Sequence, residues 1–143
     1  MSLDIFFVAF KGGESAPFDR SIALNAFGKL VEPWNDGWVV KYSDGNYYGG
    51  TLRFDEAGAN LVTGFSMNRP PFSPELLEGF LKIMRQVPSV LCFPDGDVWG
   101  FSADPNIHSE TPRGMFKRPE QCAIVATVDE FAEAAGLSWS ENS

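Results

Sequence analysis

The stretch from residue 61 to residue 101 constrains the fold most, because a strand, a proline corner, a helix and a second strand follow one another without a linker. Ser73 is suited to cap the helix, Pro74 fits its first turn, and Pro88 ends it because proline lacks an amide hydrogen. Between these limits apolar residues recur every three or four positions, so one face of the helix must be buried. The apolar residues are Leu76, Leu77, Phe80, Leu81, Met84 and Val87.

Strand patterns precede this helix. A nearly continuous apolar run at residues 3–10 predicts a central strand that is covered on both faces. Residues 38–54 predict a hairpin across an Asp-Gly-Asn turn, and residues 60–68 predict a third antiparallel strand beside it. The Gly49-Gly50 pair lies inside this hairpin, where a β-bulge or a close backbone contact explains it better than a phosphate-binding loop.

Strand patterns also follow the helix. Residues 89–101 predict a second hairpin, and residues 122–127 predict a last strand. Residues 102–121 lack periodicity, so a functional loop, a mobile loop and a short helix all remain open there. Residues 140–143 are expected to be frayed.

Two further helices complete the pattern. Residues 19–30 carry an apolar stripe that either Asp19 or Ser21 can cap, and residues 127–136 begin with a capping-box spacing and end at a glycine. The chain has no repeats and no linker rich in proline or serine. The sequence therefore predicts a single α+β domain over residues 1–143, with a mainly antiparallel sheet of about six to seven strands and two or three helices packed against it.

The composition limits the classes of partner. A chain of 143 residues with 13 Phe and 4 Trp can fold around one core, and its formal charge of -8 repels nucleic acid. This charge suits a basic protein partner, although solubility alone also favours it. Cys92 and Cys122 lie in apolar strand-like runs typical of reduced thiols, and a disulfide between them is not required. The start of the sequence resembles no signal peptide and no apolar run spans a membrane, so we expect a cytoplasmic protein.

Residues for catalysis or metal binding are scarce. The chain has one histidine and two cysteines, which do not supply a zinc cluster. His108 is the only conventional base, and it lies near Asp104, Ser109 and Glu110 in the aperiodic stretch. Triad members generally meet through the fold and not through sequence proximity, so a solvated loop histidine is the better interpretation. The sequence predicts no catalytic residue, no metal and no cofactor.

The corner after residue 68 is the most distinctive polar element, because two prolines fix the backbone next to Asn68 and Arg69. It could recognise a partner, or Arg69 could pair with a carboxylate at the end of the sheet. Aromatic and acidic residues of the first hairpin pose the same choice, since alternate residues point to opposite faces. The candidate partner-binding residues are Trp34, Asp36, Trp38, Asp44, Asn68, Arg69 and His108.

Three segments together resemble a known group of proteins: the opening MSLDIFFVAF, the strand end MNRPP, and SVLCFPDG after the helix. They look like the small, acidic, single-domain bacterial immunity proteins of polymorphic toxin systems. The resemblance implies a non-enzymatic protein that neutralises a cognate toxin domain by protein-protein contact. The alternative is a small-ligand-binding domain or small enzyme with a pocket near Arg69 and His108.

Overall fold

The computed structural model describes residues 4–34, 37–42, 48–68, 70, 72–94 and 96–137. Within these ranges the strands are β1 (Asp4–Lys11), β2 (Glu14–Ser15), β3 (Phe18–Asp19), β4 (Val31–Trp34), β5 (Gly37–Lys41), β6 (Tyr48–Glu56), β7 (Leu61–Asn68), β8 (Ser89–Cys92), β9 (Gly100–Ser102) and β10 (Cys122–Ile124). The α-helices are α1 (Arg20–Phe27), α2 (Pro74–Gln86), α3 (Ile107–Glu110) and α4 (Val128–Ala135), and short 3-10 helices occupy Gly28–Leu30 and Pro119–Gln121.

One mixed sheet holds all of these strands. Its order is β10-β9-β8-β1-β7-β6-β5-β4, with β2 paired to β1 and β3 paired to β7. Every pair is antiparallel except β9 with β10. The α+β class with a mainly antiparallel sheet is therefore confirmed, but the strands and helices outnumber those predicted. The missed elements are short: β2 and β3 have two residues each, and β4 contains Pro33, which weakens a strand pattern.

Local signals explain where the helices begin. Asp19 caps α1 by accepting a hydrogen bond from the Ser21 amide at 2.8 Å, which holds the pKa of Asp19 below its ordinary value. Ser73 caps α2 as predicted, its Oγ accepting from the Leu76 amide at 3.2 Å. Thr127 caps α4 in the same way. Helix α1 is shorter than predicted, because a 3-10 turn follows Phe27.

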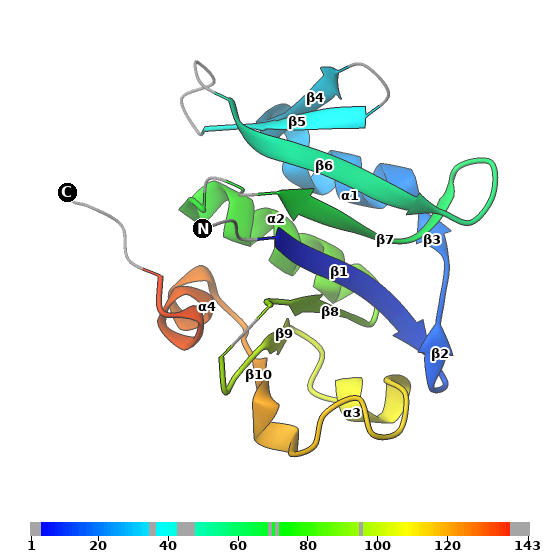
Figure 1. Cartoon of the computed structure of the whole chain (residues 1–143), viewed down its shortest axis with the longest axis vertical. Helices are drawn as coiled ribbons and strands as arrows, with labels where there is room; N and C mark the ends of the chain where they lie inside the picture. The colour runs from blue at the N-terminus through cyan, green and yellow to red at the C-terminus, as the bar shows by residue number, and fades with distance from the viewer. Residues whose placement is uncertain are drawn as a thin grey trace.

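Helices α1 and α2 lie side by side behind the sheet (Figure 1). Their apolar faces enclose a core of stacked phenylalanines, in which the rings of Phe7 and Phe65 are 4.7 Å apart and both rings pack near Phe80. Gly79 lets the helices approach, since a Cβ there would lie 2.6 Å from the ring of Phe27. The buried face predicted for α2 is thus confirmed, and it defines the helix side of the sheet.

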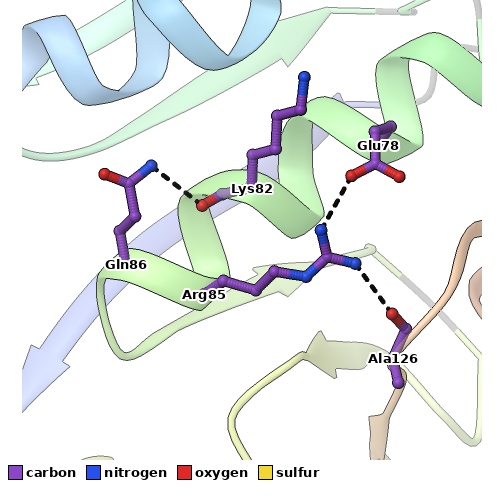
Figure 2. A network of polar contacts seen from close by, with 5 residues as sticks. All are labelled: Glu78, Lys82, Arg85, Gln86 and Ala126. Atoms are coloured by element: carbon purple, nitrogen blue, oxygen red, sulfur yellow. Dashed lines mark hydrogen bonds and ion pairs between the residues drawn. The ribbon is translucent and has the colours of Figure 1, made fainter.

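The polar face of α2 forms a hydrogen bond with the segment that precedes α4 (Figure 2). Arg85 donates one hydrogen bond from Nη1 to Glu78 Oε2 at 2.9 Å and another from Nη2 to the Ala126 carbonyl at 3.0 Å. Gln86 donates to the Lys82 carbonyl on the same helix. Arg85 therefore joins α2 to the residues that lead into α4.

The prediction that β1 is covered on both faces is wrong. Ile5, Phe7 and Ala9 are buried on the helix side, whereas Phe6 on the opposite side exposes 48% of its surface. The run is apolar for a different reason, since Phe10 further along the same side is buried by a later segment. Cover on the second side is therefore partial.

Residues 103–121 provide that partial cover. Phe10, Val90, Ile107 and Cys122 form a second buried cluster, against which Val8, Cys92, Met115 and Phe116 pack. The segment contains the short helix α3, which was one of the three alternatives left open for residues 102–121. We call this part of the second side the covered half.

A hydrogen bond and a close glycine contact attach the segment 103–121 to the strands of the covered half. Glu110 accepts a hydrogen bond from the Gly12 amide at 2.9 Å, which fastens α3 to the turn after β1. Gly100 leaves room for Phe116, since a Cβ at residue 100 would lie 2.7 Å from that ring. The cover is thus fitted to the strands beneath it.

The first hairpin also follows its prediction. Strands β5 and β6 pair in antiparallel fashion, and their register shifts between Val40 and Lys41, so that Gly49 is left without a partner. The bulge expected at Gly49-Gly50 is confirmed. The second predicted hairpin is β8 with β9, although β9 starts at Gly100, later than predicted.

Candidate functional site

The predicted partner-binding residues of the first hairpin separate into two environments. Trp34, the last residue of the edge strand β4, exposes 58% of its surface. Trp38 is half-buried and packs edge-on against Phe54 at 6.2 Å between ring centroids. Trp34 is therefore exposed enough to contact a partner, as predicted for a binding residue, whereas Trp38 contributes to the core. Asp36 and Asp44 lie outside the described residues.

The remaining predicted residues lie on other elements. Asn68 ends β7, where its Nδ2 donates to Asp4 Oδ1 at 2.6 Å across the paired strands. His108 is an exposed residue of α3, with its ring edge-on to Phe116 at 5.7 Å. Arg69 lies outside the described residues. The structure therefore does not gather Trp34, Asn68 and His108 at one point.

A row of paired residues shows which residues share the second side of the sheet. Phe6 lies opposite Ser66 on β7, and Ser66 lies opposite Arg53 on β6. In the other direction, Phe6 lies opposite Cys92 on β8. Directly opposed residues of neighbouring strands point to the same face. Arg53, Ser66, Phe6 and Cys92 therefore project from the side away from α1 and α2.

The same row reaches the edge strand. Trp38 lies opposite Leu52, which brings Gly37 level with Arg53, and Gly37 lies opposite Trp34. Because the alternation of a strand has a period of two, Trp34 points to the same side as Arg53 and Phe6. Two exposed aromatic residues thus flank an arginine on one face of the sheet.

None of the described helices lies over this part of the sheet (Figure 1). A hollow of about 180 Å³ opens between its strands. We call this surface the bare half, and it consists of Asp4, Phe6, Thr51, Arg53, Ser66 and Asn68.

Arg53 is the cation of the bare half. Its side chain is exposed, and it forms no ion pair or hydrogen bond with any residue in the described ranges. The carboxylate of Asp4 is already engaged by Asn68. Hydroxyl groups of Thr51 and Ser66 line the same hollow. The arrangement can therefore offer hydrogen-bond donors and one positive charge to a bound group.

Phe6 and Arg53 were missed at the level of sequence. The apolar run around Phe6 indicated cover on both sides, and nothing in it shows how far the cover extends. A signal was present in the partner strands, where Thr51 and Arg53 on β6 alternate with buried residues, as does Ser66 on β7. Such alternation is typical of strands with one wet face.

The two cysteines lie on the same side of the sheet but are not bonded to each other. Cys92 and Cys122 both lie opposite Gly100, one on each side of β9, so two strand spacings separate them. Burial raises the pKa of the Cys122 thiol to about 12, and burial together with the neighbouring Cys122 raises the pKa of Cys92 to about 12. Both thiols are protonated at neutral pH and are poor nucleophiles.

The pocket predicted near His108 coincides with none of four surface cavities. Their volumes are about 290, 540, 430 and 180 Å³, and His108 lines none of these four. The cavity of about 540 Å³ is a shallow groove between α1 and α2, lined by both lysine and glutamate side chains. These cavities do not place His108 in a pocket.

The described residues hold neither a metal-binding cluster nor a membrane-spanning helix. In the described part of the chain, no three His, Cys, Asp or Glu side chains converge in a way that could hold a metal ion. The helices of the described ranges are too short or too polar to span a bilayer.

Comparison of the chain with protein-family models, curated proteins and solved structures finds no match.

Proposed function

We propose that this protein is a non-enzymatic binding protein of the immunity type, which neutralises a cognate bacterial toxin domain by direct contact. The observation that carries the proposal is the exposure of Trp34 and Phe6 on one face of the sheet. Aromatic residues are enriched in protein interfaces, and tryptophan is prominent among the residues that dominate binding energy. An exposed pair on one face therefore favours a protein partner.

The size of this face supports the same proposal. Four strand spacings separate β4 from β1, which is roughly 19 Å. A standard protein interface covers about 800 Å² on each partner, which is wide enough to include both aromatic residues. One partner can thus bury Trp34 and Phe6 together.

The charge of the chain supports a basic partner. A net charge of -8 attracts a basic protein at long range and speeds its association. Many toxin domains that act on nucleic acid must carry positive charge for the same electrostatic reason. Occlusion of such a domain needs no chemistry from the immunity protein.

Co-expression tests the proposal. Toxin domains encoded beside the gene for this protein are expressed in bacteria with and without it, and survival and complex formation are measured. We expect rescue of growth and a complex that survives purification. If no neighbouring product is toxic and none binds, the proposed function is wrong.

Surface variants make this test specific. Trp34→Ala and Phe6→Thr should each raise the Kd of the complex, because each removes an exposed aromatic side chain from the proposed interface. Leu61→Ala is a matched control, since Leu61 is exposed to a similar degree at the start of β7. It should leave the Kd unchanged.

A further inference from the structure

We infer that the bare half is the docking surface for a protein segment that carries a carboxylate, and that Arg53 binds this carboxylate between the two exposed aromatic residues. The inference rests on the proposed function and assigns a recognition mode to it. Its starting point is that Arg53 lies in the same row of paired residues as Phe6 and Trp34.

Charge complementarity favours a carboxylate as the bound group. Arg53 has no ion-pair partner within the described residues, although the chain as a whole carries more acids than bases. Two other arginines show the contrast: Arg20 pairs with Glu56, and Arg85 pairs with Glu78. An unpaired arginine in an acidic protein is complementary to an external carboxylate.

The groups around the guanidinium also suit a carboxylate. Thr51 and Ser66 contribute hydroxyl groups to the hollow that Arg53 lines. The acid that lines this hollow, Asp4, is held by Asn68 and so competes less for Arg53. Donors from Arg53 and the hydroxyl groups can together satisfy both oxygens of a carboxylate.

The size of the hollow suits a single side chain. The hollow has a volume of about 180 Å³, whereas pockets for small-molecule ligands typically measure about 300–1,000 Å³. A single Asp or Glu side chain projecting from a larger surface fits this space better than a free metabolite. The exposed ring of Phe6 at the wall of the hollow then packs against apolar groups next to that carboxylate.

The covered half of the same face shows which kind of segment this sheet accepts. The chain covers the neighbouring half with its own segment, which places Ile107, Met115 and Phe116 on the strands. This segment also carries a carboxylate, Glu110, that accepts a hydrogen bond from Gly12. A protein segment with apolar residues and a carboxylate is therefore a type of cover that this sheet already accepts. The bare half continues directly from it through Cys92.

A charge reversal tests the inference with the toxin domain obtained by co-expression. Arg53→Glu should raise the Kd by about tenfold or more, because it opposes a carboxylate in the interface. Arg113→Glu makes the same change of net charge at an exposed residue of the segment 103–121, so it controls for long-range electrostatics. It should change the Kd much less.

The partner's side of the contact completes the test. Each surface Asp or Glu of the toxin domain is changed in turn to Lys, and binding to the Arg53→Glu variant is measured. One such substitution should restore affinity to Arg53→Glu while weakening binding to the wild-type protein. Circular dichroism confirms that each variant is folded.

The outcomes separate the two proposals. If the toxin domain binds the wild-type protein but Arg53→Glu and Arg113→Glu have equal affinities, the docking surface is wrong and the immunity function stands. If Arg53→Glu weakens binding and no substitution in the partner restores it, the carboxylate is wrong. If no domain binds the wild-type protein, both proposals fail.

Discussion

The two halves of one sheet face differ in what lies over them. On the covered half, Phe10, Ile107 and Cys122 are buried beneath the segment 103–121. On the bare half, Phe6 is about half exposed and Arg53 has no partner in the described residues. The same strand, β1, contributes Phe10 to one half and Phe6 to the other.

The composition of a strand therefore does not decide by itself whether a sheet face is covered by the chain or exposed. Both halves present aromatic rings, but among the described residues only the covered half has a segment fitted to it, through Gly100 and Glu110. We therefore expect substitutions in the covered half to change stability, and we propose that substitutions in the bare half change binding.

The largest expected effect lies in the covered half. Ile107 is fully buried, so Ile107→Ala should lower the free energy of unfolding by about 2–4 kcal/mol, through lost apolar burial and the cavity it leaves. Urea denaturation followed by circular dichroism measures this change. A loss below about 0.5 kcal/mol would mean that the segment 103–121 contributes little cover.

A smaller effect is expected from filling the space under Phe116. In Gly100→Ala the new Cβ would lie 2.7 Å from the Phe116 ring, so the ring must move, at a cost of about 1–3 kcal/mol. In a Phe116→Ala background the same substitution should cost less, which makes the two changes non-additive. Additive effects in the double-mutant cycle would contradict this contact.

A further effect concerns pH. The folded thiols of Cys92 and Cys122 have pKa values raised to about 12 from an ordinary value of 9.0. As the pH rises past 9, the unfolded chain releases these protons first, so stability falls between pH 9 and 12. The free energy of unfolding of a Cys92→Ala/Cys122→Ala variant, measured at pH 7.5 and pH 10, should fall less than that of the wild type. If the free energy of unfolding falls equally in the variant and the wild type, neither thiol is desolvated in the folded protein.

The α2 helix could be predicted from the sequence because its signals are local. Ser73, Pro74 and the periodic apolar face act within a few residues, and the structure confirms all three. The first hairpin and its bulge were predictable for the same reason. By contrast, β2 and β3 have only two residues each, which is too short to show periodicity.

The candidate site was less predictable because it depends on long-range pairing. Trp34 could be named from its sequence context, but its position in one row with Phe6 follows from the register of five strands. The exposure of Phe6 depends on how far the segment 103–121 extends over the sheet, which no local pattern encodes. Asn68 was a predicted recognition residue, and the structure places it in the bare half, where it bonds to Asp4 across the paired strands.

The most direct test of the division between the two halves measures two quantities on two variants. Phe6→Thr keeps a residue suited to strands and should change the free energy of unfolding by no more than about 0.5 kcal/mol, while raising the Kd for the toxin domain by about thirtyfold. Ile107→Ala should lose stability, with the Kd of its folded form unchanged. If instead Phe6→Thr loses stability and keeps its affinity for the toxin domain, the bare half is part of the structural core and the account is wrong.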